Sequence, residues 1–170
     1  MNIAVTGHTQ GLGKAFLDYY LSQGHRVAGF SRQTGFDLRD WSNMQRLLDQ
    51  TKDFDLVISN AKPDFFQTVF LYEMAKRPDR AARIISIGSC IVDNEVGTEQ
   101  DLGINLYKTQ KIALQDAHRQ IIKKCKDFDS VLVHPYHLYD VDNIDYNKLT
   151  NWIARMEYAI KDNKKEIYVE

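Results

Sequence analysis

The sequence predicts an α/β protein built on a doubly wound parallel sheet, with helices on both faces in three layers. Short apolar runs alternate along the chain with longer segments whose apolar residues recur at helical spacing. Several of these runs are continuously apolar, which is typical of strands that helices cover on both sides. Strands that alternate with helices imply right-handed crossovers and parallel pairing. The length of 170 residues suits a single domain, 1–170.

Each expected strand is a short apolar run, and the runs lie at residues 2–6, 26–30, 55–59, 83–88, 130–134 and 166–169. The first helix follows a glycine-rich turn and ends at Gly24. The second helix is capped by Asp40, whose carboxylate suits that position. Its apolar face consists of Trp41, Met44, Leu47 and Leu48.

Three further helices follow in the second half of the chain. The third runs from about 64 to 76 and stops before Pro78, because proline disfavours a helical residue in front of it. The fourth lies within 101–126, and its apolar residues are Ile104, Ala113, Leu114, Ala117, Ile121 and Cys125. The apolar residues of the last helix are Leu149, Trp152, Ile153, Met156 and Ile160.

Charge and composition exclude several classes of protein. Lys and Arg sum to 22 and Asp and Glu to 23, which argues against binding of nucleic acid or of an anionic membrane. No apolar stretch approaches the roughly 20 residues that span a bilayer, and Met1 runs straight into a strand rather than a signal peptide. Cys90 and Cys125 lack metal-ligand spacing, so we expect reduced thiols and a cytoplasmic location.

A glycine-rich segment, Thr6–Gly13, lies between the first strand and the first helix. Its spacing is Gly-x3-Gly-x-Gly. Gly7 permits a tight turn, Gly11 allows the backbone to approach a pyrophosphate, and Gly13 allows close packing of the helix on the strand. The helix N-terminus adds unpaired N–H groups for phosphates. The segment therefore predicts a dinucleotide site, with a glycine turn that binds no ligand as the alternative.

The end of the second strand indicates which dinucleotide is bound. An NAD site usually has an acidic residue about 20 positions after the glycines. Here the chain has Ser31 and Arg32 instead. Because a guanidinium matches a phosphate in geometry and charge, NADP (NADPH) is preferred, with NAD as a second choice. A solvated Arg32 is the competing interpretation.

Further motifs in the same order along the chain resemble those of the short-chain dehydrogenase/reductase family. They are the glycine loop, Asp37-Leu38, Asn60-Ala61-Lys62, a strand ending at Ser89, Tyr107-x3-Lys111 and His134-Pro135. The resemblance implies the Rossmann fold and an NAD(P)-dependent oxidoreductase. The cofactor contacts it implies are Gly7, Thr9, Gln10, Gly11, Leu12, Gly13, Ser31, Arg32, Asp37, Leu38, Asn60, Ala61, Lys62, Tyr107, Lys111, Pro135 and Leu138.

The resemblance also implies three catalytic residues: Ser89, Tyr107 and Lys111. Residues four apart share a helix face, so Tyr107 and Lys111 can reach one site. A nearby ammonium favours the phenolate, which makes proton transfer from a tyrosine easier at neutral pH. In the family the lysine also binds the nicotinamide ribose. A second match, Tyr72-x3-Lys76, does not follow a strand that ends in serine.

The chain departs from the family by being short. Residues 33–36 leave no room for the usual helix, so the third strand region is truncated, and residues 62–82 form a short crossover. That crossover lacks the asparagine of the family's proton relay, for which Gln67 or a water held by Asn60 could substitute. Lys62 lies where the family has a glycine. It either contacts an anionic group of the substrate or is a solvated lysine.

The segment that closes over substrate in the family is also trimmed. We expect the pocket to be lined by Cys90, Ile91, Tyr136, His137 and Tyr139. A metal site built on His134 and His137 lacks a third ligand at suitable spacing, so we expect no metal.

Two functions fit the sequence. The first is an NADP-dependent reductase that acts on the carbonyl of a small polar metabolite, or oxidises the alcohol. The second is a catalytically weak or inactive NADP-binding sensor or scaffold. The resemblance also implies pairing through the helix within 101–126, and hence a homodimer.

Overall fold

Six parallel strands form the sheet of the computed structural model, which describes residues 1–93, 102–136, 144–162 and 164–170. The strands are β1 (Asn2–Thr6), β2 (Arg26–Phe30), β3 (Leu56–Ser59), β4 (Arg83–Ile87), β5 (Ser130–Pro135) and β6 (Glu166–Val169). Their order in the sheet is β2-β1-β3-β4-β5-β6. All pairs are parallel, as the alternation of elements predicts.

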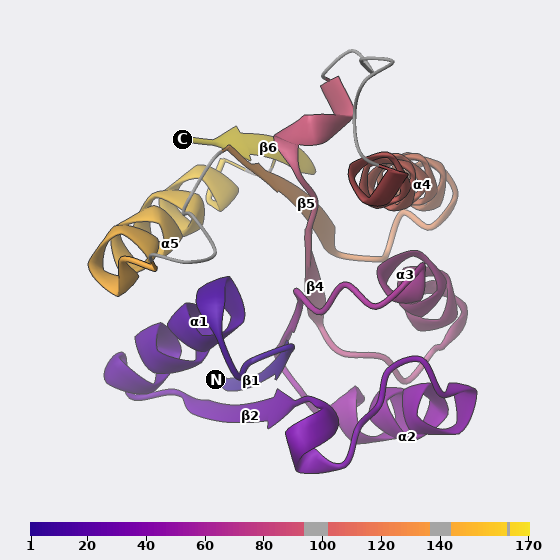
Figure 1. The fold of residues 1–170 in the computed structure, drawn as a ribbon. Helices are drawn as coiled ribbons and strands as arrows, with labels where there is room; N and C mark the ends of the chain where they lie inside the picture. Colours follow the sequence, from indigo (N-terminus) through magenta and orange to yellow (C-terminus); the bar gives the residue numbers. More distant parts are fainter. Residues whose placement is uncertain (94–101, 137–143, 163) are drawn as a thin grey trace.

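Helices cover both faces of the sheet (Figure 1). They are α1 (Gly11–Ser22), α2 (Trp41–Thr51), α3 (Phe66–Lys76), α4 (Leu102–Lys124) and α5 (Tyr146–Ile160). One core cluster joins α1 and α5 to the sheet, and the other joins α2, α3 and α4 to its opposite face. The predicted three-layer α/β architecture is confirmed.

The chain changes direction in the sheet after β2. From β1 it crosses to the neighbouring edge strand β2, and then returns past β1 to β3 on the other side. The loops that follow β1 and β3 therefore diverge to opposite faces and leave a crevice at the carboxyl edge. Parallel α/β sheets bind ligands at this kind of position.

The truncated third strand region is confirmed. Between β2 and α2 the chain makes one 3-10 turn, η1 (Arg32–Thr34), and Gly35 follows it at a φ of +79°. The crossover from β3 to β4 holds the single helix α3. Both shortened connections lie beside the crevice, so they determine how much of it is covered.

Helix α2 begins as predicted, because Asp40 Oδ1 accepts a hydrogen bond from the Ser42 N–H at 2.8 Å. The predicted apolar face is wrong at Trp41, which is 55% exposed. The buried stripe runs instead from Met44 to Thr51, so it lies over the later turns of the helix. Trp41, in the first turn, lies beyond the part that packs on the sheet.

Helix α4 confirms Leu114, Ala117 and Ile121 as buried but shows that Ile104 is 44% exposed, contrary to the prediction. In the first turns of α4, the apolar side chains of Leu102, Ile104 and Leu106 are exposed. Polar side chains take buried positions on the same helix: Lys108, Lys111, Gln115 and His118. Helix α4 therefore carries a polar stripe that faces the interior.

Several predicted boundaries move by one or two residues. β3 begins at Leu56, α3 begins at Phe66 and β4 ends at Ile87. In the described part of the chain, no helix combines the length and the apolar character that crossing a membrane requires.

Candidate active site

A pocket of about 970 Å³ lies at the carboxyl edge of the sheet. It is bounded by the segments that follow β1, β2, β3, β4 and β5 and by helix α4. The predicted site residues that line it are Gly7, Thr9, Gln10, Gly11, Leu12, Ser31, Arg32, Asp37, Leu38, Asn60, Ala61, Lys62, Ser89, Tyr107, Lys111 and Pro135. Gly13 lies behind the loop, and Leu138 falls outside the described residues.

The glycine loop adopts a conformation that suits glycine. Gly7 and Gly11 have φ angles of +70° and +54°, in the left-handed region that L side chains rarely adopt. A Cβ on Gly13 would lie 2.0 Å from the Gly7 carbonyl oxygen and 2.7 Å from Asn60 Nδ2. The start of α1 therefore packs directly on the turn, as the spacing predicts.

The N-terminus of α1 is available to a ligand. Its N-cap residue, Gln10, makes no capping hydrogen bond through its side chain. The first N–H groups of a helix have no acceptor within the helix and carry a partial positive charge. Because Gly11 and Leu12 line the pocket, these groups lie beside it and suit a phosphate or pyrophosphate.

Thr6, which was not predicted as a site residue, joins the loops after β1 and β3. Its Oγ1 is buried and accepts hydrogen bonds from the backbone N–H groups of Asn60 and Ala61, both at 3.0 Å. Asn60 Nδ2 in turn donates to the Gly7 carbonyl oxygen at 3.4 Å. These contacts fix both sides of the crevice relative to each other.

The far end of the pocket contains two arginines. Arg32 begins the turn after β2, and Arg39 follows the predicted Asp37-Leu38 pair. Both are exposed, and Arg39 Nε lies 3.7 Å from Asp64 Oδ2 in an exposed ion pair. Sequence reasoning missed Arg39, although its position directly after Leu38 was the available signal.

The three predicted catalytic residues, Ser89, Tyr107 and Lys111, line the same pocket. Ser89 follows β4, and its Oγ accepts a hydrogen bond from the Ile91 N–H at 3.3 Å. Lys111 Nζ lies 5.4 Å from the centroid of the Tyr107 ring, and Lys62 Nζ lies 4.9 Å from it. Two ammonium groups therefore lie near one phenol ring.

The second Tyr-x3-Lys match lies elsewhere. The hydroxyl of Tyr72 donates to Gln120 Oε1 at 3.1 Å, and Lys76 pairs with Glu73 on the same helix. Neither Tyr72 nor Lys76 lines the pocket. The order of motifs along the chain therefore selects the pair that the fold brings to the crevice.

Lys111 is buried and donates hydrogen bonds to two acceptors. Its Nζ lies 2.7 Å from Gln67 Oε1 and 2.7 Å from the Ile87 carbonyl oxygen. Burial lowers the pKa of Lys111 from 10.5 to about 7, and the charge of Lys62 acts in the same direction. An ammonium with such a pKa can hold or release a proton near neutral pH.

Gln67 occupies a central position under the pocket. Its Nε2 donates to the carbonyl oxygens of Ser59 at 2.5 Å and Ile87 at 3.1 Å, while its Oε1 accepts from Lys111. Of the two substitutes considered for the missing asparagine, Gln67 is the one in direct contact with Lys111. The side chain of Asn60 instead contacts the Gly7 carbonyl.

The remaining predicted pocket residues divide into two groups. Cys90, Ile91 and Tyr136 line the pocket, whereas His137 and Tyr139 fall outside the described residues. His134 is buried beneath Ser89 rather than in the pocket. Across residues 1–93, 102–136, 144–162 and 164–170, no group of three or more His, Cys, Asp or Glu side chains is placed to hold a metal.

The comparisons with known proteins agree with this geometry. Residues 3–67 match the family model of the NAD dependent epimerase/dehydratase family. A comparison with curated protein sequences gave no match. The fold is similar to that of a short-chain dehydrogenase from Streptomyces avermitilis, with a TM-score of 0.71 and 14% identity over 99% of this chain and 88% of that chain.

Two further structures resemble the chain and were solved with cofactors. A carbonyl reductase from Pseudomonas aeruginosa PAO1 in complex with NADP has a TM-score of 0.68 and 14% identity, over 98% of this chain and 94% of that one. A 3-alpha-hydroxysteroid dehydrogenase from Pseudomonas sp. B-0831 complexed with NADH has a TM-score of 0.66 and 17% identity, over 92% and 88%. Residues 3–67 thus match the NAD dependent epimerase/dehydratase family, and the fold of the chain is similar to that of solved short-chain dehydrogenases.

Proposed function

We propose that the protein is an NADP-dependent oxidoreductase that reduces the carbonyl of a small polar metabolite or oxidises the corresponding alcohol. The observation that carries this proposal is that Ser89, Tyr107 and Lys111 line the same pocket as the glycine loop. The loop suits the cofactor, because Gly7 and Gly11 line the pocket without side chains and the N-terminus of α1 lies beside it. Bound cofactor supplies the hydride.

Ser89, Tyr107 and Lys111 have different roles in the reaction. The hydroxyl of Ser89 donates a hydrogen bond to the substrate oxygen and so holds the carbonyl in place. Tyr107 provides the proton that the oxygen takes up when it becomes an alcohol, and accepts it in the reverse direction. Lys111 binds the nicotinamide ribose and, together with Lys62, stabilises the phenolate of Tyr107.

The preference for NADP over NAD rests on Arg32 and Arg39 at the far end of the pocket. Both arginines line the pocket with Asp37, and Arg39 also pairs with Asp64, which leaves Arg32 as the main candidate partner for a phosphate. Guanidinium binds phosphate through paired hydrogen bonds. The 2′-phosphate of NADP therefore has cationic partners here, whereas the uncharged 2′-hydroxyl of NAD gains little from them.

Replacing Arg32 with alanine tests this preference. We expect the Kd of NADPH to rise roughly 10- to 100-fold, since one charge-assisted hydrogen bond contributes about 1.5–3 kcal/mol. The Kd of NADH should change little. Quenching of tryptophan fluorescence during titration with each cofactor measures both constants.

Arg26→Ala is the matched control, because Arg26 is exposed at the opposite end of β2. Tighter binding of NADH than of NADPH by the natural protein would contradict the preference for NADP. Failure to bind either cofactor would contradict the proposed function altogether. Binding without turnover of any carbonyl in a screen would instead favour the sensor or scaffold.

We also propose that the protein forms a homodimer through α3 and α4, which pack against each other. The side chains of Leu102 and Leu106 on α4 are 84% and 52% exposed, and Phe65 and Val69 are exposed at the start of α3. Exposed apolar side chains that gather on adjacent helices are typical of an interface.

Leu106→Glu is expected to convert the dimer to a monomer, since it places a charge in the apolar patch. Sedimentation velocity over a range of protein concentrations measures the change. Tyr158→Glu, on an exposed position of α5, is the control and should leave the association state unchanged. A natural protein that sediments as a monomer at all concentrations would refute the homodimer.

A further inference from the structure

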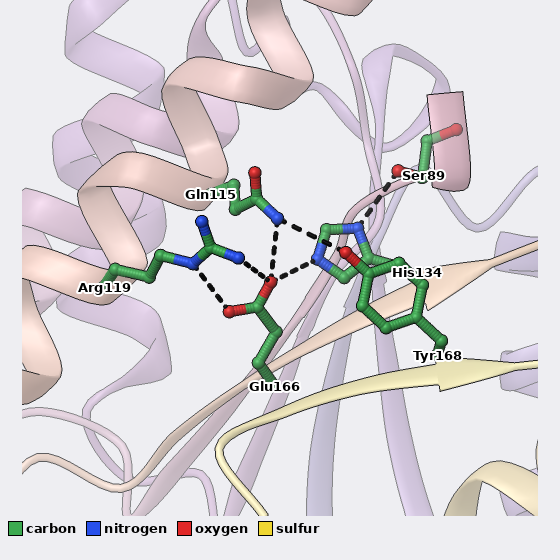
Figure 2. A network of polar contacts seen from close by, with 6 residues as sticks. All are labelled: Ser89, Gln115, Arg119, His134, Glu166 and Tyr168. Atoms are coloured by element: carbon green, nitrogen blue, oxygen red, sulfur yellow. Dashed lines mark hydrogen bonds and ion pairs between the residues drawn. The ribbon is translucent and has the colours of Figure 1, made fainter. Parts of the chain in front are cut away.

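Glu166, at the start of β6, is the centre of a polar network beneath the pocket (Figure 2). Its carboxylate accepts hydrogen bonds from Gln115 Nε2 at 2.8 Å and from Arg119 Nε and Nη2, both at 2.9 Å. His134 Nε2 lies 3.1 Å from Glu166 Oε1. Residues of α4 and β5 therefore meet at one carboxylate of the last strand.

Glu166 is ionised in this setting. Burial acts to raise the pKa of the carboxyl group, but the hydrogen bonds from Arg119 and Gln115 and the charges of Arg119 and His134 outweigh it and lower the pKa. An ionised carboxylate can only accept hydrogen bonds. The contact with His134 Nε2 is therefore one in which the ring nitrogen donates.

The other ring nitrogen of His134 faces the site. Nδ1 lies 3.0 Å from the carbonyl oxygen of Ser89, which is also an acceptor. Both ring nitrogens thus face acceptors, so both carry hydrogen when both contacts are made, and the ring is then an imidazolium. The side chain is fully buried, so water does not replace either contact.

The packing around His134 holds the ring in place. It stacks on Tyr168, with ring centroids 4.5 Å apart and an interplanar angle of 13°. On the side of Ser89, a Cβ on Gly88 would lie 2.8 Å from His134 Nδ1, so glycine there leaves the space that the ring occupies. The ring cannot turn without displacing Tyr168 or the backbone next to Ser89.

We propose that His134 and Glu166 are positioning residues for Ser89: protonated His134 bridges the Ser89 carbonyl and the Glu166 carboxylate, so that strand β6 fixes the turn carrying the Ser89 hydroxyl. The inference rests on the proposed role of Ser89 in the reaction. Without its extra proton, His134 keeps the hydrogen on Nε2, where the charged carboxylate makes the stronger bond. The contact with Ser89 is then lost.

The other titratable and charged groups around the His134 ring are either neutral or paired with a partner of opposite charge. From β6, Tyr168 remains a neutral phenol, because burial and a hydrogen bond with Asp93 raise its pKa to about 12. From α4, burial lowers the pKa of His118, which keeps that ring neutral, and Arg119 is paired with Glu166. Lys165, next to Glu166, pairs with Asp129. Glu166 is thus the anion that compensates His134.

Nuclear magnetic resonance of the protein without cofactor or substrate tests the proposal. In the natural protein labelled with 15N-histidine, we expect both ring nitrogens of His134 to carry hydrogen, because both face acceptors.

Glu166→Gln should change which ring nitrogens carry hydrogen. A glutamine amide can donate to Nε2, so a neutral ring with hydrogen on Nδ1 satisfies both neighbours and keeps the Ser89 contact. The ring should then carry hydrogen on Nδ1 alone. Asp129→Asn is the matched control, since Asp129 is another carboxylate with two cationic partners but does not contact His134.

A His134 ring with a single hydrogen in the natural protein would overturn the proposal, as would a ring in Glu166→Gln that carries hydrogen on both nitrogens. The first reading comes from the natural protein, so it stands even when a variant fails to fold. Neither reading requires turnover. An enzyme assay without activity would refute the proposed function and leave this result unaffected.

Discussion

Replacing Tyr107 with phenylalanine is expected to lower kcat by roughly 10²–10⁴-fold, which is the usual contribution of a positioned proton donor. The ring remains, so its packing beside Lys62 and Lys111 is kept. Only the hydroxyl is removed, and with it the proton that the substrate oxygen receives. Because the substitution leaves the glycine loop untouched, the Kd of NADPH should stay nearly the same.

The chain offers its own control for this substitution. Tyr72 belongs to the second Tyr-x3-Lys match, but its hydroxyl contacts Gln120 away from the pocket. Tyr72→Phe should therefore keep full activity. Steady-state rates of NADPH oxidation with a carbonyl substrate from the screen compare the two variants. Equal losses in both, or no loss in Tyr107→Phe, would exclude Tyr107 as the proton donor.

The fold was predictable because its signals are local. Each strand is a short apolar run, and α2 begins where the carboxylate of Asp40 caps it. The errors occur where local pattern and tertiary packing diverge. Trp41 and Ile104 fit helical periodicity, yet both lie on first turns that do not pack against the sheet. Periodicity alone does not reveal where a helix leaves the layer that it covers.

The candidate site was predictable to the extent that it consists of contiguous motifs. The spacing of the three glycines, Gly7, Gly11 and Gly13, indicates their backbone role. Tyr107 and Lys111 lie four residues apart on one face of a helix. Arg39 was missed because an exposed arginine has no pattern of its own, and its position directly after Leu38 was the one signal for it. The order of the motifs was enough to choose Tyr107 over Tyr72.

The contacts below the pocket could not be predicted, since they join residues far apart in sequence. Lys111 and Gln67 are 44 positions apart, and Gln115 and Glu166 are 51 apart. One signal was nevertheless present in α4. Lys111, Gln115 and His118 recur at helical spacing among apolar residues, and this pattern is typical of a polar stripe that faces the interior.

Replacing Lys111 with methionine is the second change with a large expected effect, and it acts on both activity and stability. Activity should fall to near background, because the buried amino group beside Tyr107 is removed. The effect on stability depends on pH. Since burial lowers the pKa of Lys111 from 10.5 to about 7, the folded chain releases this proton more readily than the unfolded chain does.

The sign of this effect follows from proton linkage. Between pH 10.5 and about 7 the unfolded chain holds the proton on Lys111 and the folded chain does not. The free energy of unfolding of the natural protein should therefore decrease as the pH falls through this range, and level off below it. The total is at most about 5 kcal/mol, from about 1.4 kcal/mol per pKa unit.

Lys111→Met should remove this slope, and chemical denaturation at a series of pH values measures it. The variant leaves Gln67 Oε1 and the Ile87 carbonyl without their donor, which costs stability, but that cost is the same at every pH. The difference in slope between the two proteins therefore isolates the ionisation of Lys111. Lys76→Met, on the exposed surface of α3, should keep the natural slope. Parallel slopes for the natural protein and Lys111→Met would contradict the lowered pKa of Lys111 in the folded chain.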